Sequence, residues 1–311
     1  MIEIVAQSEA MREAVSLAER VAATDANVLV TGESGAGKDA LALFVHFRSK
    51  RAAQALVKID CATLPADLLE AELFGYERGA FTGANEAKPG RLEAAHRGTL
   101  VLDEIACLSV DAQAKLLRVI ETREFERLGG RRTIKVDARL IALTNVDLAN
   151  AVKRRDFRED LFYRLNVVHI HLAPLRERSE DLPPLADWFL KTYAVKHGRK
   201  LTGIAPGALA LLKEYEFPGN VRELANTVER AVIVSVGKRL EESDLPATVR
   251  AAVLLQQRRS RPRTLAEIEA AYIAEVLSAT SGNKTAAARI LGISRKNLYE
   301  KIARYELGSK V

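Results

Sequence analysis

Cysteine is nearly absent from this sequence: its 311 residues include only Cys61 and Cys107. Two isolated thiols provide neither a disulfide framework nor a metal-binding spacing, and they suit a reducing compartment. No apolar run is long enough to cross a bilayer. Residues 1–7 lack the basic segment followed by an apolar one that a signal peptide requires. The sequence therefore predicts a cytoplasmic protein that does not span a membrane.

Aromatic residues are also scarce, at 5%, but apolar residues make up 48% of the chain. A chain of this length and composition can bury a substantial core and is expected to form two or three domains. Residues 1–250 hold 36 basic and 36 acidic side chains, whereas residues 251–311 hold 11 basic and 5 acidic ones. All the net charge of +6 therefore lies in the last fifth of the chain. This predicts a nucleic-acid-binding tail, although a merely solvated basic face would have the same composition.

Short apolar runs rich in β-branched residues alternate with helical patterns in the first half of the chain. The predicted strands are 27–31, 56–59, 99–102, 140–143 and 167–170. Strands that alternate with helices indicate a parallel sheet covered on both faces. We therefore expect an α/β domain over residues 1–172.

After Pro174 the pattern is helical, with breaks at Pro–Gly pairs, which predicts a small helical lid over residues 173–250. Residues 251–263 are polar, basic and interrupted by proline, as in an exposed linker. A last helical unit, 264–311, begins with a capping box formed by Thr264 and Glu267.

A phosphate-binding loop follows the first predicted strand. In Gly32-x-x-x-x-Gly37-Lys38, backbone N–H groups can surround phosphate oxygens, and Lys38 can reach the terminal phosphates. Asp39 stands where a serine or threonine hydroxyl often binds Mg²⁺. The predicted nucleotide-binding residues are Gly32, Glu33, Ser34, Gly35, Ala36, Gly37, Lys38 and Asp39.

Asp103 and Glu104 end a predicted apolar strand at its carboxyl end, where ligands of parallel sheets bind. Asp103 is expected to hold Mg²⁺, directly or through water, and Glu104 to polarise the attacking water. Alone, such a pair is also typical of a strand that runs into a turn. Together with the upstream loop it predicts ATP hydrolysis.

The stretch Gly79-Ala80-Phe81-Thr82-Gly83-Ala84 places an apolar and a hydroxyl side chain between two glycines. Glycine permits backbone geometries that other residues resist, so we expect a mobile loop with an apolar tip. It would lie on an insertion within a helix, between residues 68–75 and 90–93. An ordinary glycine-containing connector is the alternative.

Residues 281–299 have the layout of a helix-turn-helix. Small alanines allow close packing of the helices, Gly292 forms the turn, and Ser294 caps the second helix. The predicted DNA-contacting residues are Lys284, Ser294, Arg295, Lys296, Asn297 and Tyr299. Upstream, Leu265, Ile268, Tyr272 and Val276 form one apolar helical stripe, which suits either an intradomain core or a dimer contact.

Together these motifs resemble the bacterial enhancer-binding proteins, AAA+ activators of sigma-54 RNA polymerase that carry a C-terminal Fis-type helix-turn-helix. The resemblance covers nearly the whole chain. It implies an α/β AAA+ P-loop ATPase with a helical lid and an all-α DNA-binding domain. It also implies a ring, expected to be a hexamer with a dimer as a resting state, that hydrolyses ATP with Mg²⁺ while bound to enhancer DNA and remodels the closed complex of sigma-54 polymerase.

The resemblance also implies roles for single residues. Asn145 corresponds to sensor I, near the γ-phosphate, and Arg222 to the sensor II of the lid. Arg158 and Arg164 match the pair that faces the nucleotide of a neighbouring subunit, although surface arginines are the plainer interpretation. The family has an acid at the position of Asp39, which makes that residue a second candidate for Mg²⁺.

The loop residues Phe81 and Thr82 are implied to contact sigma-54, with a second loop near residues 129–132 beside them. Two positions depart from the family pattern: Ala36 replaces a threonine, and Asp60 replaces an asparagine that restrains the glutamate at position 104. Since two nearby carboxylates repel each other, we expect the coupling between nucleotide and loop to differ.

Two other classes of protein are alternatives to this interpretation. A DNA-binding regulator with a decayed ATPase would act by occupancy alone, but Lys38, Asp103 and Glu104 argue against decay. A AAA+ remodeller or replication ATPase would lack both the 79–84 loop and the terminal helix-turn-helix. No receiver or sensory domain precedes the phosphate-binding loop in this sequence, so either a separate partner controls the protein or the chain is a fragment of a longer one.

Overall fold

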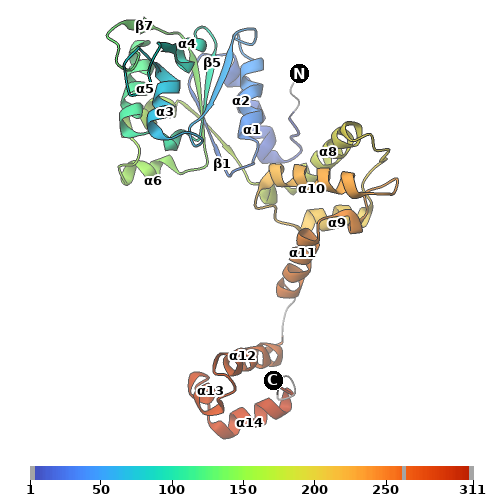
Figure 1. Ribbon diagram of the computed structural model, residues 1–311. Helices are drawn as coiled ribbons and strands as arrows, with labels where there is room; N and C mark the ends of the chain where they lie inside the picture. Colours follow the sequence, from blue (N-terminus) through green and yellow to red (C-terminus); the bar gives the residue numbers. More distant parts are fainter. Residues whose placement is uncertain (1–3, 261–263, 308–311) are drawn as a thin grey trace. The chain divides into compact units, whose positions relative to one another are not determined.

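The computed structural model describes residues 4–260 and 264–307 (Figure 1). The chain divides into two compact units, Met1–Arg250 and Ala251–Val311. The first unit contains the α/β region and the helical lid. The second contains the helix-turn-helix.

A five-stranded parallel sheet forms the centre of the α/β region. Its strands, in spatial order, are β2 (Leu56–Asp60), β5 (Thr99–Asp103), β8 (Arg139–Thr144), β1 (Val28–Gly32) and β9 (Val168–Leu172). All five predicted strands are present, and the predicted α/β class is confirmed. Because the strands are parallel, their carboxyl ends meet at one edge, where Asp60 lies opposite Asp103.

Helices cover both faces of this sheet (Figure 1). One face carries α1 (Glu9–Ala22) and α2 (Lys38–Phe47). The other carries α3 (Ala66–Phe74), α4 (Arg91–Ala94), α5 (Val110–Thr122), α6 (Leu148–Lys153) and α7 (Glu159–Leu165). Successive strand residues alternate between the two cores: on β8, Leu140 packs toward the second set of helices and Ile141 toward the first. Burial on both faces explains why these strands read as continuous apolar runs.

Two small antiparallel hairpins extend from the second face. The first pairs β3 (Gly75–Tyr76) with β4 (Lys88–Pro89), and the second pairs β6 (Glu124–Glu126) with β7 (Thr133–Lys135). The first hairpin begins where α3 ends and closes the segment that contains residues 79–84. The insertion predicted between residues 68–75 and 90–93 therefore occurs at that place.

The helical lid follows β9 and the short turns η2 (Leu175–Glu177) and η3 (Ser179–Asp181). It consists of α8 (Leu182–Lys196), α9 (Pro206–Glu214), α10 (Asn220–Val234), the turn η4 (Glu242–Asp244) and the start of α11 (Ala247–Ser260). Within the described residues no named strand follows β9. The proline-containing breaks lie at or just before helix starts: Pro206 begins α9, as proline fits the first turn of a helix, and Pro218 and Pro246 precede α10 and α11.

Residues 251–263 had been expected to form an exposed linker. Of these residues, 251–260 are helical, because α11 continues through Ser260, and residues 261–263 lie outside the described part of the chain. A helix can serve as a linker, so that assignment stays a prediction. Val249 and Val253 are buried on this helix. Gln, Arg and Leu are good helix formers, and the basic composition concealed that propensity.

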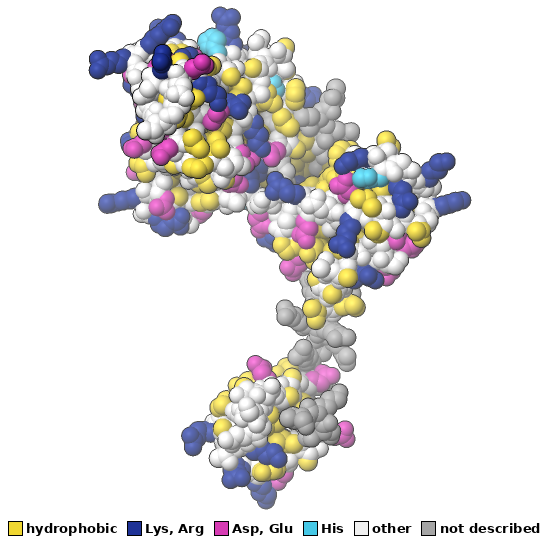
Figure 2. All heavy atoms as spheres, viewed as in Figure 1, with side chains coloured by type: hydrophobic (Ala, Val, Ile, Leu, Met, Phe, Trp, Pro, Cys, Tyr) yellow, Lys and Arg dark blue, Asp and Glu magenta, His cyan; other side chains and the backbone are white. Residues whose placement is uncertain are grey.

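The second unit contains α12 (Leu265–Ala279), α13 (Lys284–Ile290) and α14 (Arg295–Arg304). Its core is small and consists of Ile273, Val276, Ala287, Ala288 and Leu298. Two fully or nearly buried alanines on α13 allow the close helix packing that the sequence predicted. Figure 2 shows Lys and Arg side chains gathered toward the lower left of this unit.

Candidate functional site

The predicted phosphate-binding loop connects β1 to α2, and its backbone requires glycine. Gly35 and Gly37 have φ angles of 75° and 108°, which L-residues with side chains rarely adopt. A Cβ atom at Gly35 would lie 2.3 Å from the carbonyl oxygen of Gly219 in the lid. The loop is therefore fixed by close contact with the lid as well as by its own geometry.

Five successive carbonyl oxygens of this loop, from Gly32 to Ala36, each accept a hydrogen bond. In chain order the donors are Lys38 Nζ for the first two, Asn220 Nδ2, the backbone N–H of Val221, and Arg178. Three of these donors, Asn220, Val221 and Arg178, belong to the segments that follow β9. Since the carbonyl groups are held by these donors, the loop can present N–H groups to an anion.

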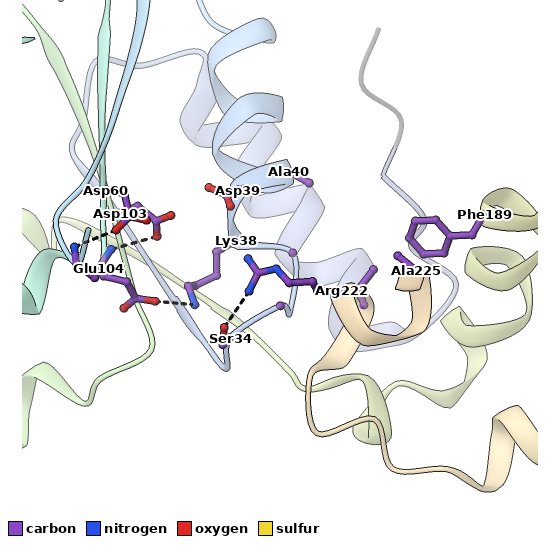
Figure 3. A pocket seen from close by; sticks show the side chains of 14 residues that line it. Ser34, Lys38, Asp39, Ala40, Asp60, Asp103, Glu104, Phe189, Arg222 and Ala225 are labelled. Atoms are coloured by element: carbon purple, nitrogen blue, oxygen red, sulfur yellow. Dashed lines mark hydrogen bonds and ion pairs between the residues drawn. The ribbon is translucent and has the colours of Figure 1, made fainter. Parts of the chain in front are cut away.

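Lys38 is buried, and its ammonium group lies 3.9 Å from Glu104 Oε1 (Figure 3). Burial lowers the pKa of Lys38 from its ordinary value, and the charge of Glu104 opposes that shift. A buried cation surrounded by carbonyl oxygens and carboxylates is suited to receive a phosphate.

Asp103 and Glu104 follow each other at the carboxyl end of β5. Glu104 has a φ angle of 51°, an uncommon conformation for a residue other than glycine and one that is enriched at functional sites. Its Oε2 accepts a hydrogen bond from the backbone N–H of Asn145, at 3.2 Å, at the end of the neighbouring strand β8. The carboxylate of Glu104 is thus held between Lys38 and Asn145.

Asp39 and Asp103 both bind the ammonium group of Lys58, on β2. Lys58 Nζ lies 2.7 Å from Asp103 Oδ2. Burial disfavours its charge, but the hydrogen bonds to Asp103 and Asp39 outweigh that effect and raise the pKa of Lys58. Sequence reasoning missed Lys58; the available signal was a lone charged residue in the middle of a predicted strand.

The same two carboxylates fit a magnesium ion. Both reach a single cationic atom, so both can reach a cation placed there. Within the described residues no group of three or more His, Cys, Asp or Glu side chains forms a metal cage. Mg²⁺ needs no such cage, because it usually binds one or two carboxylates and completes its shell with water and substrate phosphates.

Asp60 lies next to Asp103 in the sheet, and its Oδ1 accepts the N–H of Ala62 at 2.9 Å. This local turn occupies one of its carboxylate oxygens. The contacts of Glu104 are instead to Lys38 and Asn145, so residues other than Asp60 hold this carboxylate.

The lid completes the cavity. Arg222 on α10 donates a hydrogen bond to Ser34 Oγ at 3.1 Å (Figure 3). A cavity of about 420 Å³ lies between the loop, the sheet edge and the lid. Its lining includes Ser34, Gly35, Gly37, Lys38, Asp39, Asp60, Asp103, Glu104, Phe189 and Arg222.

Glu33 belongs to the phosphate-binding loop, but its carboxylate binds residues beyond β9 instead of facing the cavity. Its carboxylate binds Arg176 through two hydrogen bonds, of 2.7 and 2.8 Å, and also accepts one from Asn220. The hydrogen bonds from Arg176 and Asn220 lower the pKa of Glu33 to about 2. Glu33 therefore joins the loop to the lid.

Arg158 and Arg164 lie outside this cavity. Arg158 forms two hydrogen bonds with Asp160, and Arg164 forms an ion pair with Glu121, at 3.0 Å. Asn145 lines a separate cavity, together with Thr31 and His169. The structure thus brings together the phosphate-binding loop, Asp39, Asp103, Glu104 and Arg222, and leaves both arginines on the surface.

The 79–84 loop is stabilised by few contacts of its own. The N–H of Gly79 bonds the carbonyl oxygen of Ala84, at 2.8 Å, and the Phe81 ring packs edge-on against Tyr76. Phe81 remains 40% exposed. Gly129 of the second hairpin lies against Ala80, so the two predicted loops are neighbours.

The base of the two hairpins is joined by backbone hydrogen bonds of Leu128 to Gly75 and Glu77 and by the side chain of Arg127. Arg127 pairs with Glu93 on α4, at 2.8 Å, and with Glu77 on the first hairpin, at 3.1 Å. The tip is therefore held at its base and exposed at its end.

In the second unit, the predicted capping and turn residues lie where they were expected. Ser294 accepts the N–H of Asn297 at the start of α14, and Gly292 has a φ angle of 67°. Lys284 stacks on the ring of Tyr299. Of the apolar stripe on α12, Val276 is buried, whereas Leu265, Ile268 and Tyr272 are exposed.

Comparison with known proteins identifies a family for each part of the chain. The sigma-54 interaction domain family matches residues 4–171, the AAA+ ATPase lid domain family matches residues 176–262, and the Fis family of bacterial regulatory proteins matches residues 264–305. The chain belongs to the sigma-54-dependent transcriptional regulators. It thus shares their AAA+ region, sigma-54 interaction domain and Fis-type DNA-binding domain.

Individual members of this family are similar over most of the chain. The regulatory protein AtoC of Escherichia coli (strain K12) is 45% identical over 310 residues, covering 97% of this chain and 67% of AtoC. The transcriptional regulatory protein ZraR of Klebsiella oxytoca is 46% identical over 303 residues, covering 97% of this chain and 68% of ZraR. The crystal structure of NtrX from Brucella abortus in complex with ATP has a TM-score of 0.76 at 35% identity, covering 98% of this chain and 70% of that chain.

These relatives confirm the resemblance drawn from the motifs, and the AAA+ sigma-54 region implies ATPase activity. None of the described helices is both long and apolar enough to span a membrane.

Proposed function

We propose that the protein is a sigma-54-dependent transcriptional activator that hydrolyses ATP with Mg²⁺ and uses the energy to remodel the closed complex of sigma-54 polymerase. The observation that carries this proposal is the cavity that unites the phosphate-binding loop, Lys38, Asp103, Glu104 and Arg222. The ATP complex of the similar NtrX structure supports a nucleotide as its ligand. A protein with these partners acts in the bacterial cytoplasm.

Several residues of the cavity are given a part in phosphoryl transfer. Lys38 neutralises phosphate charge, and Arg222 approaches the nucleotide from the lid. The carboxylate of Glu104 accepts a hydrogen bond from the attacking water and orients it toward the γ-phosphate, while Asn145 keeps that carboxylate in place. Asp103 and Asp39 would hold Mg²⁺, which neutralises developing charge on the phosphate oxygens.

A ring is proposed as the active form, with a hexamer as its expected size and a dimer as a resting state; the surface position of Arg158 and Arg164 leaves both available to a neighbouring subunit. In one chain, both arginines pair with nearby acids and neither reaches the cavity. A neighbouring copy can supply them, and an arginine supplied in trans accelerates phosphoryl transfer by about 10³–10⁵-fold. We expect the rate of hydrolysis per subunit to rise steeply with protein concentration. A rate that stayed constant upon dilution to monomer would contradict this assignment.

Phe81 and Thr82 are proposed to contact sigma-54 at the tip of the first hairpin. The exposed aromatic ring offers apolar area at the end of a loop whose glycines permit movement. Because the base of the loop is anchored by Arg127, motion of the surrounding helices can be passed to the tip.

The second unit is proposed to bind enhancer DNA. Arg295, Lys296 and Asn297 occupy the first turn of α14, the part of a recognition helix that enters the major groove. The exposed residues Leu265, Ile268 and Tyr272 would join two copies, which would then read half-sites about one helical turn apart or a multiple of it.

Open-complex formation tests this function as a whole. With purified sigma-54 polymerase and a sigma-54 promoter, we expect open complexes with ATP and none with a non-hydrolysable analogue. Open complexes without hydrolysis, or no hydrolysis under any condition of assembly, would leave only a passive DNA-binding regulator.

A further inference from the structure

Lys58 lies on β2 with its ammonium group between two carboxylates from different elements. It is 2.7 Å from Asp103 Oδ2, at the end of β5, and it hydrogen-bonds Asp39 Oδ1, in the first turn of α2. A single positive charge thus brings these two acids to one point. The proposed function requires a divalent cation at the same point.

This arrangement differs from an ordinary surface ion pair. Lys115, on α5, is a suitable comparison, because its side chain is 47% exposed and that of Lys58 is 44% exposed. Within the part of the chain that the structure describes, Lys115 pairs with Glu70 alone. Lys58 pairs with two acids, and both of them line the nucleotide cavity.

The charges show what Lys58 does in this position. Without a cation, two neighbouring carboxylates repel each other and also repel the phosphates of a nucleotide. Lys58 supplies one positive charge, whereas Mg²⁺ supplies two and binds several oxygen ligands at once. The lysine is therefore a weaker substitute that the ion can displace.

We propose that Lys58 is a tethered cation that occupies the magnesium position between Asp39 and Asp103 and competes with the metal for both carboxylates. The inference rests on the proposed magnesium-dependent nucleotide site. It has two consequences: Lys58 lowers the affinity of the site for a divalent ion, and it lets the site bind nucleotide that carries no metal.

The test uses the full chain with Lys58→Gln and Lys58→Met, which remove the charge, and with Lys115→Gln as the matched control. Binding of Mn²⁺ alone is measured from the loss of the paramagnetic resonance signal of the free ion. Binding of a fluorescent ADP analogue is measured in EDTA and in saturating Mg²⁺. None of these measurements depends on hydrolysis.

We expect both Lys58 variants to bind Mn²⁺ about three- to tenfold more tightly than the wild type, because one screened positive charge has been removed. In EDTA they should bind the ADP analogue about three- to tenfold more weakly, and in saturating Mg²⁺ they should match the wild type. Lys115→Gln should behave as the wild type in every arm.

Unchanged or weaker Mn²⁺ binding by both Lys58 variants would overturn the inference. So would an equal loss of ADP binding with and without Mg²⁺, which is the result expected if Lys58 only supports the fold. If the wild type itself bound neither Mn²⁺ nor the ADP analogue, the proposed nucleotide site would fail, and this inference with it. That outcome is distinguishable, because the first two leave wild-type binding intact.

Discussion

Two glycine-containing loops of the first unit use glycine for opposite reasons. At Gly35, in the phosphate-binding loop, an added Cβ would lie 2.3 Å from the Gly219 carbonyl oxygen, whereas at Gly79 and Gly83 it would meet no atom within 4 Å. The first loop needs glycine so that two backbones can approach each other. The tip loop needs it for positive φ angles in open space. The phosphate-binding loop thus lies in close contact with the lid backbone, whereas the glycines of the tip loop lie in open space.

The largest expected effect is the loss of open-complex formation without a loss of ATP hydrolysis, because it follows from a substitution in the tip loop alone. Thr82→Ala removes a hydroxyl group from the exposed tip and leaves every residue of the nucleotide cavity unchanged. We expect ATP hydrolysis within about twofold of the wild type, since surface substitutions away from a site have small effects, and no open-complex formation. Both are measured with sigma-54 polymerase on one promoter. Transcription that survived this change would remove the assigned role of the tip.

A matched pair of glycine substitutions tests the comparison directly. Gly35→Ala places a methyl group against the lid backbone at a positive φ angle, so the loop or the lid has to shift. We expect nucleotide affinity to fall by about ten- to a hundredfold, which corresponds to the usual range of backbone strain. Gly83→Ala also places a side chain at a positive φ angle, of 106° compared with 75° at Gly35, but it meets no neighbour.

The control variant Gly83→Ala should therefore keep nucleotide affinity within about twofold of the wild type. Fluorescence titration with an ADP analogue measures both variants. Equal losses in the two proteins would mean that φ strain alone, and not contact with the lid, determines how the first loop behaves.

The phosphate-binding loop could be predicted from the sequence, whereas the contacts that hold it in place could not. The phosphate-binding loop and the Asp103–Glu104 pair were recognisable because short motifs encode them, and because the carboxyl ends of parallel strands meet. The contacts from Asn220 and Arg176 to the loop connect residues more than 140 positions apart. Such long-range pairs leave no local pattern in a single sequence.

Lys58 and α11 illustrate the same limit in two other ways. Lys58 had a visible signal, a charged residue within an apolar strand, but its two acidic partners lie on other elements. Residues 251–263 were predicted to be a linker from their composition, which reports exposure better than conformation. Continuous apolar runs, by contrast, predicted all five strands of the sheet, because burial on two faces determines their residues.

A smaller effect is expected where the lid holds the first loop. Asn220→Asp keeps the acceptor that binds the N–H of Leu175, and aspartate tolerates the positive φ angle at this position. It removes the donor to Ser34 and places a negative charge next to Glu33. We expect nucleotide affinity to fall about three- to tenfold, as for the loss of one or two hydrogen bonds.

Asn150→Asp, at an exposed position of α6, is the control for this change, because among the described residues the Asn150 side chain bonds to its neighbour Asp147 alone. Calorimetric titration with ADP compares the two variants. If Asn220→Asp bound ADP as the wild type does, the hydrogen bonds from the lid to the loop would not contribute to nucleotide binding.

The smallest effect concerns the ion pair that joins the same loop to the lid. The pKa of Glu33 is lowered from 4.5 to about 2 in the folded protein, so its contribution to stability is complete above pH 4.5 and is lost as the pH falls toward 2. Glu33→Gln removes this contribution and should flatten the acid side of the Tm profile between those values. Because both side chains are partly exposed, we expect a difference on the order of 1 °C. The control Glu13→Gln, on the exposed side of α1, should leave the Tm profile unchanged. If Glu33→Gln also left it unchanged, the loop would be held by Asn220 and Val221 without help from this ion pair.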